Sequence, residues 1–164
     1  MSFSYYVSVT LHVLAAIVWL GGMFFIALVG GPVLRAVEPQ VRARLFRDLG
    51  LRFRTVGWVA LTILVVTGLA NLALRDLLQW SVLLSGDFWA TPYGRVLGVK
   101  LGAVLVMLVL SGLHDFVIGP AAARLEAGSE AAAAVRVRAS RLARVNAVVG
   151  LVLVVAAVRL ARGG

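Results

Sequence analysis

The chain has 164 residues, of which 62% are hydrophobic, and it carries a formal net charge of +9. Its mean hydropathy of +1.00 is far above that of soluble domains, and several apolar runs are long enough to cross about 30 Å of hydrocarbon. It contains no cysteine, which excludes disulfides, thiolate metal sites and cysteine redox chemistry. Composition therefore predicts an all-α integral membrane protein.

Four apolar stretches predict a transmembrane four-helix bundle that forms a single domain over residues 1–164. The first run is too long for a signal-peptide core and has no basic segment before it, so we expect it to be retained as a span. Between the first two spans, apolar residues recur at helical spacing against arginines, which predicts a cytoplasmic amphipathic helix over about residues 39–54. The predicted spans cover about residues 5–34, 55–75, 93–118 and 142–161.

Arginine is distributed unevenly among the connections between these spans. Six arginines lie between the first and second spans and five between the third and fourth, whereas the middle connection holds only Arg75 and Arg95. The positive-inside rule then places the protein in the cell (inner) membrane with the arginine-rich loops in the cytoplasm and both termini on the outer side. The membrane topology and attraction to anionic lipid explain the net positive charge of the chain. We therefore expect the protein to interact with the bilayer and not with nucleic acid.

Two ionisable residues, His12 and Lys100, lie inside predicted spans, where such groups are expensive and mark functional sites. The offset that superposes Gly31-Pro32 on Gly119-Pro120 also superposes His12 on Lys100, which predicts two parallel-repeat helical hairpins. Both residues lie seven positions inside their spans, roughly 10 Å along the axis. We therefore expect their side chains to lie at equal depth and to partner each other.

Other polar residues are predicted to reach the same outer layer. The second and fourth spans run outward, which brings Thr67, Asn71 and Arg159 towards it. His114 lies about 21 Å further along the third span than Lys100, beside an aspartate. It is therefore not expected to ligate the same iron as His12, and we interpret it as a polar anchor at the inner end.

Small and aromatic residues mark the outer end of the third span. Gly94, Gly98 and Gly102 form a ridge that predicts close approach of a neighbouring helix. The preceding segment carries an aromatic belt typical of a membrane interface, and we expect it to lie as a lid over the bundle. The belt consists of Trp80, Phe88, Trp89 and Tyr93.

The chain carries a set of short motifs: Leu11-His12, Trp19, Gly21-Gly22, the first Gly-Pro, Thr67-Gly68, and Thr91-x-Tyr93-Gly94 before Lys100. Together these motifs resemble the copper-resistance D (CopD) domain family over nearly the whole chain. A more distant resemblance is to HemJ-type protoporphyrinogen oxidases, small membrane bundles that hold haem b. In those oxidases a histidine in the first helix and a lysine in a later helix are the important pair, which implies His12 and Lys100 here. Their further histidine near the end of the first helix has no counterpart in residues 30–35.

The chemistry of these residues predicts a haem b site in the outer half of the bundle, with a redox or electron-transfer role. Neutral imidazole is a normal axial ligand of haem iron, so His12 is the first candidate ligand. Lys100 would be the opposing ligand if deprotonated, or otherwise the partner of a propionate. Arg159 or Arg95 would bind propionates at the outer surface, and Trp19, Met23 and Met107 would pack against the porphyrin. A quinone, a porphyrin or another lipophilic substrate would reach the site from lipid, and a homodimer is plausible.

Three alternatives stay open. Copper transport or copper resistance is the first, although copper(I) prefers thiolate and thioether ligands and the chain offers three methionines and two histidines. A haem or porphyrin transporter would use the same cavity reversibly. In a purely structural subunit, His12 would only hydrogen-bond a neighbouring helix and Lys100 would extend to the interface.

Overall fold

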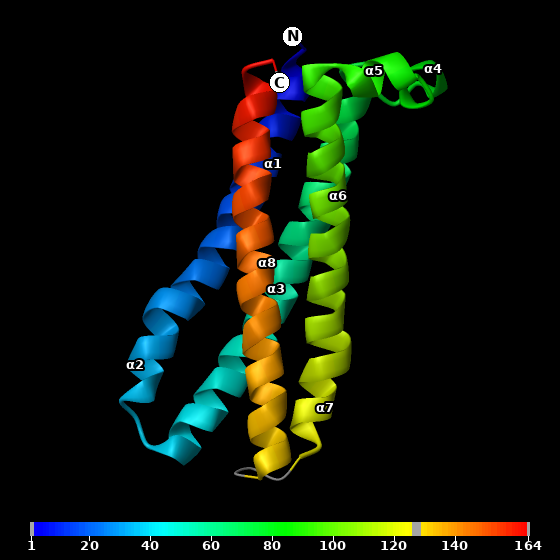
Figure 1. Cartoon of the computed structure of the whole chain (residues 1–164). Helices are drawn as coiled ribbons and strands as arrows, with labels where there is room; N and C mark the ends of the chain where they lie inside the picture. The colour runs from blue at the N-terminus through cyan, green and yellow to red at the C-terminus, as the bar shows by residue number, and fades with distance from the viewer. Residues whose placement is uncertain (1, 126–128, 164) are drawn as a thin grey trace. The chain divides into compact units, whose positions relative to one another are not determined.

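A computed structural model describes residues 2–125 and 129–163 of the chain, and every regular element within those ranges is helical (Figure 1). Four of its helical segments are long and apolar enough to cross a membrane, which confirms the predicted all-α, four-span class. These segments are Phe3–Arg35, Pro39–Ala73, Pro92–Ala122 and Ala134–Ala161.

The chain divides into two compact units, and each unit is a helical hairpin. The first unit, Met1–Leu84, and the second, Ser85–Gly164, repeat one order of elements: a span, a π-helical segment, a short proline-started helix and a long returning helix. The elements of the first unit are α1 (Phe3–Phe25), the π segment Ile26–Gly30, α2 (Gly31–Arg35), α3 (Pro39–Ala73) and α4 (Trp80–Leu83). Those of the second are α5 (Gly86–Ala90), α6 (Pro92–Gly112), the π segment Leu113–Ile118, α7 (Gly119–Ala123) and α8 (Glu130–Ala161).

In the first unit, α1 and α3 pack antiparallel along most of their length. Small residues permit the approach: the Trp19 ring lies against Gly57, and the Phe53 ring lies against Gly22. Burial of Trp19, Ala60 and Leu61 forms the apolar part of this seam. The amphipathic segment predicted at residues 39–54 forms the first turns of α3 without a break, so one helix of 35 residues contains both it and the second span.

The contact between Gly22 and Phe53 gives a direct test of this seam. A methyl group at Gly22 would overlap the Phe53 ring, whereas a methyl group at Gly21 would meet nothing within 4 Å. We expect Gly22→Ala to lower the free energy of unfolding by about 1–3 kcal/mol, as overpacking does, and Gly21→Ala to leave it unchanged or slightly raised. Denaturant titration of both variants in detergent measures the difference, and equal stability would contradict this packing.

Each π-helical segment comes directly before a Gly-Pro pair. Proline has no N–H to donate and its ring clashes with the carbonyl four residues earlier, so a regular α-helix cannot continue through it unchanged. The chain widens by one residue instead: the N–H of Gly31 bonds to the carbonyl of Ile26, and that of Gly119 bonds to the carbonyl of His114. The offset that superposes the Gly-Pro pairs also superposes these two bonds, so the repeat extends to backbone geometry.

The second unit packs α6 against α8, with α5 covering the first turn of α6. Leu97, Met107 and Ala156 are buried, together with the polar residues Ser111 and Asn146. Helix α8 begins at Glu130, well before the apolar part that spans the membrane.

Helix α5 packs against the predicted ridge of glycines on α6. A methyl group at Gly94 would overlap the Phe88 carbonyl oxygen, and one at Gly98 would touch the Trp89 ring at 3.7 Å, while Gly102 has nothing within 4 Å. The predicted aromatic belt lies partly in this contact, because the ring of Phe88 packs edge-on to Trp89 with centroids 5.0 Å apart. At Gly94 and Gly98 the close approach is therefore made by the short α5.

Candidate functional site

His12 lies on the face of α1 that packs against α3, half-buried between the two helices. Its Nδ1 is 2.8 Å from the Thr67 hydroxyl oxygen. Gly68 lies beside the ring, where a methyl group would stand 3.5 Å from His12 Cε1. Thr67 and Gly68 were singled out as a motif of the second span, and in the structure they form the surface that holds the imidazole.

The hydrogen bonds of Thr67 favour the tautomer of His12 that carries its proton on Nδ1. The Thr67 hydroxyl lies 2.5 Å from the carbonyl oxygen of Ile63, and a carbonyl oxygen only accepts. The single hydroxyl proton therefore goes to Ile63, and the hydroxyl oxygen accepts from Nδ1–H of His12. In the neutral ring, Nε2 then carries the lone pair. Proteins orient metal-bound histidines in this way, by a hydrogen bond from the ring nitrogen that does not bind the metal.

Two further polar groups belong to the same cluster of the first unit. The buried Ser8 hydroxyl donates to the backbone carbonyl of Thr67 at 3.3 Å, one turn of α1 before His12. Asn71 lies one turn beyond Thr67 on α3, and among the residues placed by the structure no donor reaches its buried Oδ1. A buried amide oxygen without a donor is costly, so this position suits a water or a ligand O–H.

The remaining predicted site residues are distributed over both units. Trp19 is 5% exposed and packs against Gly57 in the first unit, so its ring contributes to the α1–α3 seam. Lys100 is half-buried on α6, Met107 is 2% exposed on the same helix, and Arg159 lies exposed in the last turn of α8. The pairing of His12 with Lys100 joins residues of different units and stays a prediction, as do cofactor contacts of Trp19, Met107 and Arg159.

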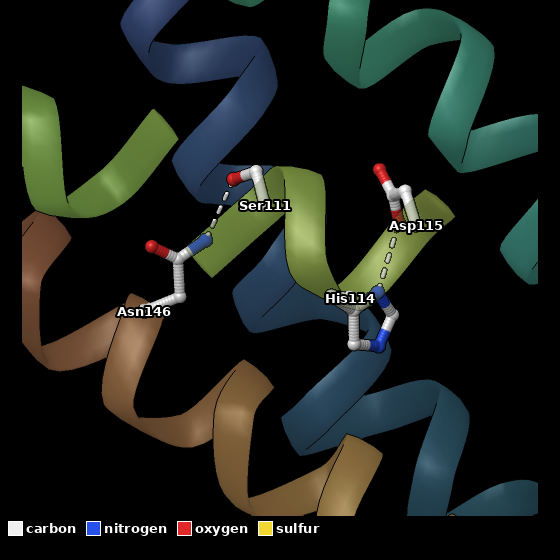
Figure 2. Close-up of polar contacts among 4 residues, drawn as sticks. All are labelled: Ser111, His114, Asp115 and Asn146. Carbon is white, nitrogen blue, oxygen red and sulfur yellow. Dashed lines mark hydrogen bonds and ion pairs between the residues drawn. The ribbon is translucent and has the colours of Figure 1, made fainter. Parts of the chain in front are cut away.

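His114 lies in the π segment of the second unit (Figure 2). Its Nδ1 donates to Asp115 Oδ1 at 2.8 Å, which makes a histidine–carboxylate pair of neighbouring residues. Figure 2 also shows Asn146 of α8 donating through Nδ2 to the Ser111 hydroxyl at 3.0 Å. This buried interhelical bond resembles the one between Ser8 and Thr67 in the first unit, and it joins α6 to α8.

Sequence reasoning did not single out Ser8 as a member of the site. A serine one helical turn before His12 was a usable signal, since residues four apart lie on one helix face. The tautomer of His12 had no sequence signal, because it depends on a backbone carbonyl of another helix.

The described residues offer few metal donors. In the part of the chain that the structure describes, no three His, Cys, Asp or Glu side chains come together as a metal cage. A bare copper ion needs several protein ligands of that kind or thioethers. Haem iron receives four ligands from the porphyrin and needs only an oriented histidine from the protein, and His12 is oriented in that way.

These observations define a multi-pass helical membrane protein built from two similar hairpins, with a buried polar cluster in the first. Residues 48–160 match the family described as copper resistance protein D, CopD. An uncharacterized protein of Aquifex aeolicus (strain VF5) is 34% identical over 154 residues, covering 93% of this chain and 92% of that protein. No solved structure matches the chain. The chain belongs to the CopD family.

Proposed function

We propose that this CopD-family protein binds haem b through Nε2 of His12 and serves a redox or electron-transfer reaction at the outer face of the cell membrane. The observation that carries the proposal is the bond from His12 Nδ1–H to Thr67, because it leaves the lone pair on the nitrogen that ligates. Both termini would lie outside, so His12, about two and a half turns into α1, would be in the outer leaflet.

The other residues have separate parts in this proposal. Thr67 holds the imidazole in one tautomer, and the Asn71 amide oxygen accepts a hydrogen bond from a protonated propionate or a water. Lys100 would either ligate the iron or neutralise a propionate. When bound, haem supplies reversible one-electron transfer at the iron. The surrounding apolar helices exclude water and admit a lipophilic electron donor or acceptor, such as a quinone, from the bilayer.

Copper transport or copper resistance is the second candidate, and the description of the family favours it. Transport would use His12 and the methionines as a transient path for copper(I) rather than a permanent cage. A haem or porphyrin transporter is a third candidate, in which His12 would release its ligand. Metal and haem content of the purified protein separates the three, since only a resident cofactor stays bound through purification.

Absorption spectra of the purified protein, oxidised and dithionite-reduced, test the proposal. We expect a Soret band that shifts on reduction in the wild type, disappears in His12→Ala, and persists in the matched control His114→Ala. Loss of a Lys100 ligand would change the spin state in Lys100→Ala, whereas loss of a propionate partner would weaken binding without moving the band. If no Soret band forms even after haem is added, the haem proposal is wrong, and bound copper would then favour the second candidate.

A further inference from the structure

The second unit contains a groove of about 420 Å³ between α6 and α8, and no residue of the His12 cluster lines it. Its walls are apolar: Val96 and Val99 of α6 face Val152 and Val155 of α8. Arg95 and Arg159 also line it. In Figure 1 the two helices run side by side, green-yellow and orange-red. The groove lies at the end of their seam where α6 begins and α8 ends, because residues 92–99 and 152–159 line it.

Both arginines lie at the same end of this hairpin. Arg95 is in the first turn of α6, and Arg159 is in the last turn of α8. The valine Val152 lies seven residues from Arg159 along α8, roughly 10 Å deeper in the membrane-spanning part. The groove is therefore charged at its membrane-surface end and apolar towards the membrane centre, as a phospholipid is charged at its headgroup and apolar along its acyl chains.

The arginines need an explanation because they lie where positive charge is otherwise scarce. Across residues 2–125 and 129–163 no carboxylate forms an ion pair with either guanidinium. Arg159 also interrupts an apolar run that extends from Ala147 to Leu160. Guanidinium groups at the edge of the hydrocarbon are stabilised by an anion, and their planar donors fit a phosphate in two-point hydrogen bonding.

We propose that this groove is a binding site for an anionic phospholipid of the surrounding leaflet. Arg95 and Arg159 bind the phosphate, and an acyl chain lies along the valines. Charge complementarity selects an anionic headgroup over a zwitterionic one, because a headgroup amine would bring a positive charge towards the two guanidinium groups. Basic pockets between transmembrane helices are a known setting for anionic headgroups. The proposal does not rest on haem binding, since neither His12 nor Lys100 lines the groove.

Native mass spectrometry of the full-length protein in detergent tests the site with a defined probe. The protein is titrated with an equimolar mixture of phosphatidylglycerol and phosphatidylcholine that carry the same acyl chains. We expect phosphatidylglycerol to be retained preferentially, with about a fivefold loss for each of Arg95→Gln and Arg159→Gln and more than tenfold for both. The matched control is Arg162→Gln, which removes the same charge from the same end of α8 but outside the groove.

A second variant tests the apolar part without touching charge. Val155 is 59% exposed and lines the groove, so Val155→Trp should fill it and lower phospholipid retention while the protein stays folded. Equal retention of both lipids, an equal loss in Arg162→Gln, or displacement of phosphatidylglycerol by inorganic phosphate alone would overturn the proposal. If Arg159→Gln loses haem but keeps the phospholipid, the groove binds a haem propionate instead. If Val155→Trp abolishes a dimer, the groove is the contact with a second copy of the chain instead.

Discussion

Replacing Gly94 with alanine should detach α5 from α6 and cause a larger loss of stability than any other single methyl addition to α6. The added methyl would overlap the carbonyl oxygen of Phe88 and would lie 2.9 Å from its carbonyl carbon and 3.0 Å from Trp89 Cα. These are backbone atoms, which cannot move aside by a change of rotamer. We expect Gly94→Ala to lower the free energy of unfolding by about 3 kcal/mol, the upper end of the range for overpacking.

The junction is tight because Thr91 joins both helices. Its hydroxyl accepts from the N–H of Gly94 at 2.9 Å and donates to the Phe88 carbonyl at 2.6 Å. This oxygen is the one that a methyl group at position 94 would strike, so strain at Gly94 also breaks the N-terminal cap of α6. The motif Thr91-x-Tyr93-Gly94 thus has a local physical reason that is separate from any cofactor.

Two glycines on the same helix are natural controls. A methyl group at Gly98 would make an ordinary 3.7 Å contact with the Trp89 ring, and a methyl group at Gly102 would meet nothing within 4 Å. Gly98→Ala and Gly102→Ala should therefore be neutral or slightly stabilising, since alanine is the better helix former by about 1 kcal/mol. Thermal unfolding in one detergent compares the three variants, and a stability loss in Gly102→Ala equal to that in Gly94→Ala would show that the α5 contact is not its cause.

Hydropathy was sufficient to predict the spans, because each contains an apolar run longer than a membrane requires. It was insufficient for the helix ends. Hydropathy did not show that the amphipathic segment at residues 39–54 and the second span form one helix. Helix α3 runs from Pro39 to Ala73 because helical hydrogen bonding continues through its arginine-rich turns. The π segments were also missed: proline indicates that a helix is perturbed, but not whether it bends, ends or widens.

The candidate site divides in the same way between local and tertiary information. Helical depth placed His12, Thr67 and Asn71 in one layer, and the structure brings His12 and Thr67 into hydrogen-bonding contact. Which residues of each helix contact a neighbouring helix depends on the rotation of that helix about its axis, and depth does not give this rotation. Trp19 lies on the packed face of α1 against Gly57, a contact that depends on the partner helix and that spacing within α1 does not reveal.

Removing the Thr67 hydroxyl should reduce haem binding while leaving the hairpin folded. Thr67→Val keeps the shape of the side chain but leaves His12 Nδ1–H without its acceptor, so the ring loses its fixed tautomer and orientation. Loss of a hydrogen bond that orients a ligating histidine costs about 10–100-fold in affinity, and we expect this loss for haem titrated into the purified variant. The bound haem should also have a higher reduction potential, because an imidazole that donates a hydrogen bond is the stronger ligand to ferric iron.

The matched variant Thr67→Ser restores the hydroxyl and should keep affinity and potential near wild type. The free energy of unfolding distinguishes this proposal from a purely structural role for His12. The backbone carbonyl of Thr67 still accepts from Ser8 in both variants, so the free energy of unfolding should fall by only about 1 kcal/mol in Thr67→Val. If Thr67→Val binds haem as tightly as Thr67→Ser and differs from it only in unfolding, Thr67 and His12 form an interhelical tether and the ligand must be sought elsewhere. If the loss of haem-binding free energy exceeds the loss of unfolding free energy, Thr67 is a positioning residue for His12.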